Sequence, residues 1–461
     1  MKISKMIADY IYDIKFESIP GFVIEEKKKN ILDILGVMTA GASGKGCHEV
    51  ICEITDWAGR KDATIFQHDC KVPAHNAALA NCMMARALDF DDVFTDSIIH
   101  INATNVPVAF LMAEFRGNVS GQKFLSAITL GADLSARMGL ANNVPSNISG
   151  YSFTFQFGSI IAAIVASRLM GLTPNQINDA IGIAYSQLAG NNQGYVDGAM
   201  TIRLQQGLSA AAGVLGALMA EKGITGAKDI FEGKFGYYNV FAGGDYNRQT
   251  LIQNLGHEFY GVKHTTKPYP CCTHLHGAIE GIDKIIKENK IVPKDVESIR
   301  IGINQSAYNI CCIPEESKKR PQTVVDLQFS YNFVISAMLF ENKLDLDSFN
   351  ESYLKRNDIL DFGQSKIETY VNANSSRDNK SITDTELALK TIDGNVFKEQ
   401  IPFPHGSKEK PMTFEQCVQK FKMCVEKAKK HIPDRKVERI IEMIENFEKL
   451  ENVMELYGMF D

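Results

Sequence analysis

The sequence lacks the short motifs by which common cofactor enzymes are recognised. It contains no G-x-G-x-x-G after a strand pattern, no G-x-x-x-x-G-K-[ST], no G-x-S-x-G and no H-E-x-x-H. Nicotinamide-dependent, nucleotide-binding, serine-hydrolase and zinc-peptidase chemistry therefore lack the residues on which they depend.

The spacing of the cysteines also argues against a metal centre. None of the ten cysteines belongs to a C-x-x-C pair, and Cys271-Cys272 and Cys311-Cys312 are adjacent in the sequence. Adjacent thiolates rarely bind one metal, whereas iron–sulfur clusters need spaced ones. We therefore expect free thiols in a reducing compartment, with neither a metal nor a cofactor.

Long apolar runs and an excess of positive charge are also missing. No stretch reaches the roughly 18–20 apolar residues of a membrane helix. The first twenty residues, interrupted by Lys2, Lys5 and Asp9, contain no signal-peptide core. The net charge of -6 disfavours nucleic acid or an anionic membrane as the main partner, although local cations can still bind an anionic substrate. We expect a cytoplasmic protein.

What is present is the pattern of a large, mainly helical protein. A chain of 461 residues exceeds one ordinary core. Helical periodicity dominates up to about residue 262 and returns from Thr413, whereas residues 296–303 alternate as a strand and residues 385–401 form a hairpin around Asp393-Gly394. The predicted fold is mainly α, with a discontinuous all-α domain (1–265 and 405–461) and a smaller α+β lid domain (266–404).

Several residues predict where helices begin. Ser120 and Thr173 are candidate N-caps, and Pro174 suits the position that follows. Pro107 is expected in the first turn of its helix, and Thr273 is expected to cap the helix after it.

The most unusual stretch joins the Ala-rich helix predicted over residues 74–86 to three carboxylates, Asp89, Asp91 and Asp92. Acidic residues at a helix C-terminus oppose the macrodipole. Two interpretations remain. The carboxylates cap the next turn and face water, or at least one faces a pocket with His100 as its proton-transfer partner.

Two further segments carry candidate binding residues. In residues 267–276 (KPYPCCTHLH), prolines stiffen the backbone around Tyr269, and Lys267 and His276 place positive charge beside free helix amides. This segment is an ordinary loop or a carboxylate receptor at the domain boundary. Arg203, at the start of another helix, makes a local salt bridge or binds a carboxylate in bidentate fashion.

Together these motifs resemble the MmgE/PrpD family, which includes 2-methylcitrate dehydratases, cis-aconitate decarboxylases and iminodisuccinate epimerases. The residues that carry the resemblance are Leu-Asp-Phe-Asp-Asp, with His100 eleven residues after its first Asp, and KPYPCC followed by His276. The resemblance covers nearly the whole chain. It implies the same two-domain layout, a homodimer formed by the helical domains, and proton abstraction next to a carboxylate without a cofactor.

The sequence departs from the family pattern at four positions. Ile202 replaces the usual active-site Lys, and Gln205 and Ser152 replace His residues. Cys272 stands where the decarboxylase branch has a catalytic His. These losses disfavour the standard tricarboxylate substrate and fit a smaller or less charged one.

We predict a cofactor-independent lyase, similar to 2-methylcitrate dehydratase, that acts on a small di- or tricarboxylate. The predicted site residues are Asp89 and His100 for proton transfer, and Arg203, Lys267, Tyr269 and His276 for substrate binding. Alternatives are a decarboxylase, an isomerase or epimerase of a related carboxylate, and a catalytically silent carboxylate-binding homologue.

Overall fold

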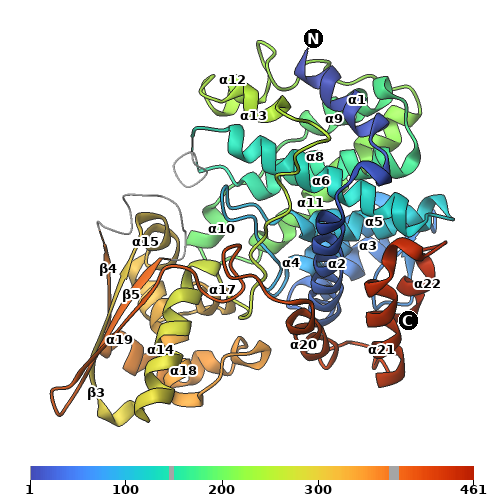
Figure 1. The fold of residues 1–461 in the computed structure, drawn as a ribbon. Helices are drawn as coiled ribbons and strands as arrows, with labels where there is room; N and C mark the ends of the chain where they lie inside the picture. Colours follow the sequence, from blue (N-terminus) through green and yellow to red (C-terminus); the bar gives the residue numbers. More distant parts are fainter. Residues whose placement is uncertain (1, 145–149, 373–383, 461) are drawn as a thin grey trace. The chain divides into compact units, whose positions relative to one another are not determined.

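The computed structural model describes residues 2–144, 150–372 and 384–460, and the chain divides into two compact units. Unit 1 contains Met1–Asn191, Arg203–His264 and Thr413–Asp461, and unit 2 contains Asn192–Ile202 and Thr265–Met412 (Figure 1). In the described residues of unit 1, the regular structure consists of helices and one short strand pair, whereas unit 2 combines helices with a four-stranded sheet. The predicted fold class, mainly α with a smaller α+β part, is confirmed.

Helices make up more than half of the described part of unit 1. Their bounds are α1 (Ile3–Asp13), α2 (Gly21–Gly41), α3 (Cys47–Asp56), α4 (Ala74–Arg86), α5 (Asn102–Arg116), α6 (Gly121–Ala141), α8 (Phe153–Met170), α9 (Pro174–Tyr185), α11 (Thr201–Glu221), α12 (Tyr237–Phe241), α13 (Arg248–Ile252), α20 (Phe414–Val425), α21 (Asp434–Glu445) and α22 (Met454–Tyr457). The sequence indicated no strand in this region, but β1 (Ala63–Thr64) pairs with β2 (Lys71–Val72). Two residues per strand are too few to produce a visible alternation.

Helix α8 lies at the centre of unit 1 and packs against α5, α6 and α9. By length and composition it could cross a membrane, which the sequence analysis did not anticipate. However, 94% of its 18-residue window is buried inside the protein. A helix that is apolar on all sides and covered by other helices is a core element.

The C-terminal helices pack onto the N-terminal part of unit 1. Helix α20 runs beside α2 (Figure 1), so closely that a Cβ added at Gly36 would lie 3.2 Å from the Cα of Phe421. Further along, the rings of Phe110 and Tyr457 stack with centroids 4.8 Å apart. Unit 1 is therefore closed by residues from both ends of the chain.

Unit 2 is built on a sheet in the order β4-β3-β5-β6. Its elements are β3 (Val296–Ile303), β4 (Ile367–Val371), β5 (Thr385–Thr391) and β6 (Val396–Ile401), with the helices α10 (Gln193–Val196), α14 (His276–Asn289), α15 (Gln305–Cys311), α16 (Glu315–Lys319), α17 (Val324–Gln328), α18 (Tyr331–Glu341) and α19 (Asn357–Lys366). Strand β3 is parallel to β4 and antiparallel to β5, opposing Ile301 to Leu387. Helix α14 packs on β5, β6 and α18, so the apolar face of the sheet is covered.

Two of the predicted helix starts are confirmed, and two are wrong. Ser120 and Thr173 cap α6 and α9 as predicted, each accepting a hydrogen bond from the backbone N–H three residues on. Pro107 was misplaced, because α5 begins at Asn102 directly after the Phe94–Ile99 bridge and Pro107 lies inside the helix. Thr273 makes no capping bond, since a 3-10 turn precedes α14.

The compact units differ from the predicted ranges mainly at residues 192–202. This segment belongs to unit 2, where Lys318 donates a hydrogen bond to the Tyr195 carbonyl. Gly198, with φ 61°, lies so close to Thr323 that an added Cβ would be 2.6 Å from its hydroxyl. A chain excursion of this kind is fixed by long-range contacts and leaves no local pattern.

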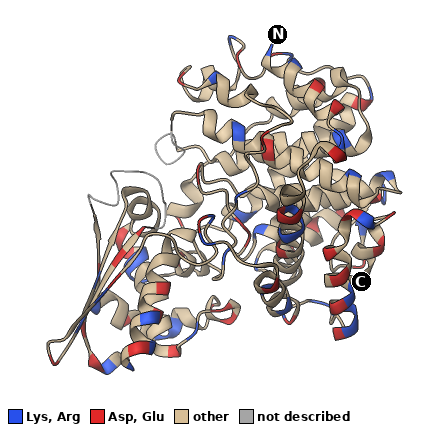
Figure 2. Ribbon diagram, in the orientation of Figure 1, with Lys and Arg blue, Asp and Glu red and all other residues tan. Residues whose placement is uncertain are grey.

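Acidic and basic residues are interspersed along both units (Figure 2). A small number are buried, among them Lys27, Asp33, Arg86, Asp91 and Lys420 in unit 1. Burying a charge is costly unless it is paired. The pairing of these groups identifies the candidate site.

Candidate active site

The three carboxylates after α4 do not face water. Asp89 is 4% exposed, and Asp91 and Asp92 are fully buried. Asp89 adopts a φ of 51°, in the left-handed region that Asp tolerates better than most residues. This turn sends the chain back beneath the end of the helix, so the interpretation of these residues as solvent-facing caps is wrong.

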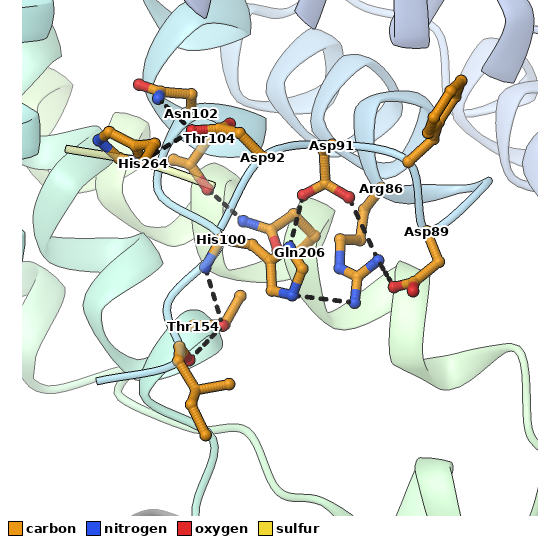
Figure 3. A network of polar contacts seen from close by, with 12 residues as sticks. Arg86, Asp89, Asp91, Asp92, His100, Asn102, Thr104, Thr154, Gln206 and His264 are labelled. Carbon is orange, nitrogen blue, oxygen red and sulfur yellow. Dashed lines mark hydrogen bonds and ion pairs between the residues drawn. The ribbon is translucent and has the colours of Figure 1, made fainter. Parts of the chain in front are cut away.

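Arg86, the last residue of α4, compensates the carboxylates. Its Nη1 donates to Oδ1 of Asp89 in a very short ion pair, and lies 3.3 Å from Oδ1 of Asp91 (Figure 3). A cation at this position is also favoured by the helix macrodipole. The sequence analysis missed Arg86, although a basic residue in the last turn, three residues before an Asp, was a readable signal.

His100 is paired with Asp91, whereas the sequence analysis had favoured Asp89 as its partner. Its Nδ1 lies 2.8 Å from Oδ2 of Asp91, and its Nε2 lies 3.4 Å from Nη2 of Arg86. A carboxylate only accepts and a guanidinium only donates, so Nδ1 donates to Asp91 and the Nε2 lone pair faces the Arg86 guanidinium. A buried carboxylate thus orients the imidazole, as it does in many sites where a histidine acts as general base.

The loop that delivers His100 is held in a strained conformation. Ile98 has a φ of 55°, which is rare for a β-branched residue, and the loop is closed by an antiparallel bridge between Phe94 and Ile99. Thr154, on α8, holds its end: Oγ1 accepts the His100 backbone N–H at 3.2 Å and donates to the Ile98 carbonyl at 3.4 Å. Strain of this kind persists only where surrounding contacts impose it, and it is concentrated at functional sites.

A second carboxylate–imidazole pair adjoins the first. Oδ2 of Asp92 lies 2.8 Å from Nδ1 of His264 and accepts a hydrogen bond from Asn102 at 2.7 Å (Figure 3). Lys27 is fully buried nearby, donating to the Gly261 carbonyl at 2.7 Å. Burial lowers the pKa of Lys27 to about 8, although the Asp92 carboxylate acts to raise it. The sequence analysis identified neither His264 nor Lys27.

Arg203, predicted as a carboxylate anchor, belongs to the same buried cluster in unit 1. It is 4% exposed, and its Nη1 lies 3.4 Å from the Lys45 carbonyl. Burial lowers the pKa of Arg203, as does the Arg86 guanidinium, whereas Asp89 raises it. The charges of Arg86 and Asp89 therefore both affect the pKa of Arg203.

Helix α11, which carries Arg203, approaches α4 closely. A Cβ added at Gly207 would lie 2.2 Å from the Leu79 carbonyl oxygen, so only glycine fits there. One position earlier, Gln206 donates to Oγ1 of Thr104 at 2.5 Å (Figure 3). The close approach brings α11 to the helix that ends in Arg86.

The remaining predicted residues, Lys267, Tyr269 and His276, lie within ten residues of one another in unit 2. Lys267 and His276 are buried, and Nε2 of His276 donates to the Cys271 carbonyl at 3.3 Å. The Tyr269 ring packs edge-on against His276 with centroids 5.6 Å apart. Burial raises the pKa of Tyr269 above its usual range, so the phenol stays protonated.

The four positions that depart from the family pattern have ordinary structural surroundings. Ile202 belongs to the hydrophobic core of unit 2. Gln205 pairs with the backbone of Asn191 through both ends of its amide. Ser152 and Cys272 are buried.

Two models of known protein families match most of this chain. The family model of the MmgE/PrpD N-terminal domain matches residues 5–249, and that of the MmgE/PrpD C-terminal domain matches residues 269–449. The chain belongs to the MmgE/PrpD family. The resemblance read from its motifs is confirmed.

Relatives in the MmgE/PrpD family cover almost the full chain. A cis-aconitate decarboxylase of Aspergillus terreus is 24% identical over 441 residues, 91% of this chain and 88% of the relative. The cis-aconitate decarboxylase of Homo sapiens is 24% identical over 465 residues, 98% and 92% of the respective chains. A cis-aconitate decarboxylase-like protein of Aspergillus oryzae is 24% identical over 474 residues, 98% and 96%.

Proposed function

We propose that this MmgE/PrpD protein is a lyase that acts on a small di- or tricarboxylate by proton transfer next to a carboxylate, using side chains alone. The observation that carries the proposal is His100, a buried imidazole whose Nδ1–H donates to Asp91 and whose Nε2, beside the Arg86 guanidinium, is left as the acceptor nitrogen. The names of the relatives support a carboxylate substrate and a lyase reaction.

If Nε2 of His100 is the acceptor nitrogen, as we propose, the site is suited to a reaction that begins with proton removal. In a dehydration, a base takes the proton on the carbon next to a carboxylate, and hydroxide then leaves with a proton from an acid. In a decarboxylation, carbon dioxide leaves first and the carbanion is protonated afterwards, so the reaction starts best from an imidazolium. We therefore propose a hydro-lyase of the 2-methylcitrate dehydratase type. Decarboxylation is the second candidate, favoured by the relatives' names.

The proposed roles of the other residues follow from their chemistry. Asp91 orients His100, and Arg86 with Asp89 holds that pair in place. In unit 1, Arg203 supplies a buried guanidinium suited to bidentate carboxylate binding. In unit 2, we propose that Lys267 and His276 bind carboxylates and that Tyr269 donates to the anionic intermediate, which preorganised donors stabilise strongly.

The test is proton NMR in deuterated water with 2-methylcitrate, citrate, cis-aconitate and iminodisuccinate-type compounds. New vinylic signals from a hydroxy acid indicate a hydro-lyase, and loss of a carboxylate carbon indicates a carboxy-lyase. Deuterium incorporation without net conversion indicates an isomerase. His100→Gln should abolish each of these signals. His68→Gln is a matched control, because His68 is also buried and its Nδ1 donates to the Phe66 carbonyl at 2.9 Å.

The same panel separates the enzyme from a silent binding protein. Calorimetric binding of a carboxylate without turnover, unaffected by His100→Gln, would support the binding homologue and refute the lyase. Turnover in the parent that is lost in His100→Gln and kept in His68→Gln would support the lyase.

We also propose that the protein is a cytoplasmic homodimer that uses α11. This helix presents a partly exposed stripe without charge, formed by Leu204, Leu208, Leu215 and Met219, of which Leu208 is 50% and Met219 40% exposed. A self-complementary stripe on one helix suits a two-fold interface. Light scattering should give twice the chain mass of 51.1 kDa, and Leu208→Glu should reduce it to one chain. A parent mass of one chain would refute the dimer.

A further inference from the structure

Lys420, on the C-terminal helix α20, reaches the backbone of the carboxylate loop. Its Nζ donates to the carbonyl oxygen of Phe90 at 2.7 Å and lies 3.9 Å from the centre of the Phe90 ring. The side chain is 4% exposed. A buried ammonium that binds one particular carbonyl and one particular ring fixes both in space.

The Phe90 peptide is the piece of backbone that connects the two functional carboxylates. Asp89, which pairs with Arg86, precedes it, and Asp91, which orients His100, follows it. Because Asp89 adopts a left-handed φ of 51°, the loop needs an external contact to keep this conformation. The bond from Lys420 to the Phe90 carbonyl is such a contact.

Lys420 is itself held by Asp33 on α2. Its Nζ lies 2.6 Å from Oδ1 of Asp33, which is 1% exposed. The close packing of α2 on α20 at Gly36 and Phe421 keeps the two charged side chains in register. Helices α2 and α20 together therefore fix the position of the Lys420 ammonium, and with it the carbonyl to which the ammonium donates.

The charges around Asp33 link this pair to the site. Burial raises the pKa of Asp33 to about 6, Lys420 lowers it, and the carboxylates of Asp92 and Asp91 raise it further. Asp33 and the two loop carboxylates thus interact electrostatically, and Lys420 contacts both Asp33 and the loop backbone at Phe90.

We propose that Lys420 is a positioning residue for the Asp91–His100 pair, held by Asp33 and acting through the Phe90 carbonyl. The proposal rests on the proposed function for its kinetic consequences, but the position of His100 can be measured without turnover. The C-terminal helix α20 is in this sense part of the active site, although it contributes no group that touches the reacting atoms.

The test compares Lys420→Met with Lys420→Arg and with Lys422→Met. Lys422 lies on the same helix but is 38% exposed and paired with Glu438, so Lys422→Met is a matched control. Each variant is assayed for kcat and KM, for the pH profile of kcat, for thermal unfolding, and for the NMR titration of the His100 ring, assigned with His100→Gln.

We expect Lys420→Met to lower kcat on the order of 100-fold with KM changed less than about threefold, because misplacement by roughly 1 Å has that effect. The titration midpoint of His100 should move to higher pH, since a buried cation is lost while the neighbouring carboxylates remain. Lys420→Arg should keep kcat within about tenfold, and Lys422→Met should match the parent in every measurement.

A Lys420→Met protein with a lower unfolding temperature but unchanged kcat, pH profile and His100 titration would overturn the proposal. If Lys420→Met fails to fold, Asp33→Asn decides, because it loosens the ammonium without removing it. It should then shift the His100 titration and lower kcat about tenfold, and a parent-like result would refute the proposal. If the parent shows no turnover on any substrate, the proposed function fails, and the His100 titration alone still supports or refutes the role of Lys420.

Discussion

Replacing Asp91 by Asn tests the core of the proposed mechanism. In the structure, Oδ2 of Asp91 accepts from Nδ1 of His100 at 2.8 Å, and Oδ1 lies 3.3 Å from Nη1 of Arg86. The amide of Asn offers one acceptor where both neighbours donate. If its oxygen faces His100, its NH2 faces Arg86; if it flips, its NH2 faces Nδ1 and drives the proton to Nε2. Either way the base is misoriented or blocked.

The expected size of the effect is a fall in kcat of about 10³–10⁴, because loss of a carboxylate that fixes a catalytic imidazole has this effect in the Ser-His-Asp enzymes. That range corresponds to about 4–5 kcal/mol of transition-state stabilisation. The assay is the initial rate of vinylic proton formation, or of deuterium exchange, at saturating substrate, with unfolding temperature measured in parallel.

Asp92→Asn is the matched control, since Asp92 is equally buried, adjacent in sequence and paired with the other imidazole, His264. Both variants remove one buried carboxylate, so their unfolding temperatures should fall by similar amounts. Asp92→Asn should keep kcat within about tenfold of the parent. Equal loss of kcat in both variants, or a fall of less than tenfold in Asp91→Asn, would refute the assignment of Asp91 as the partner of His100.

Three further predictions concern stability and loop geometry. The pKa of Asp33 is raised to about 6 in the folded protein, so folding favours the protonated carboxyl group. The stability that this protonated group contributes below pH 4 is therefore lost as the pH rises through 6. Denaturant titrations should show the Asp33→Asn protein gaining up to about 3 kcal/mol relative to the parent between pH 4 and 7, and a constant difference would contradict the burial argument. Thr154→Val keeps the side-chain shape but leaves the His100 N–H and the Ile98 carbonyl without their hydroxyl partner, so kcat should fall more than KM changes and stability should fall by about 1–3 kcal/mol. Gly207→Ala should destabilise the protein by about 1–3 kcal/mol in thermal denaturation, since its Cβ meets the Leu79 carbonyl, and an unchanged transition would show that α4 and α11 can separate without cost.

Much of the fold could be predicted from local pattern. The helix over residues 74–86 and the strand over residues 296–303 match the structure residue for residue, and the hairpin around Asp393-Gly394 joins β5 to β6. In each case the periodicity and the turn residues agree with the tertiary environment. Pro107 failed because proline marks a helix start only statistically, and nothing local showed that the helix had begun at Asn102.

The site was predicted less completely, for a physical reason. Sequence spacing placed His100 near three carboxylates and favoured Asp89 as its partner, whereas Nδ1 of His100 pairs with Asp91 in the structure. The left-handed turn at Asp89, which sets the direction of these side chains, has no local signature in the sequence. Two residues distant in the sequence contact this loop, His264 through Asp92 and Lys420 through the Phe90 carbonyl. Tertiary packing brings them there, and no residue near the motif indicates them.

The ion pair between Asp33 and Lys420 constrains how the protein is made. Their codons are separated by the whole of unit 2, so the ribosome releases α2 long before α20 exists. Until then the Asp33 carboxylate has no cation to bury with, and the surface of α2 that α20 will cover remains open to solvent. Unit 1 therefore completes its core only after unit 2 has been synthesised. The face of α2 that packs on α20 in the folded protein therefore stays uncovered until the last part of the chain has been synthesised.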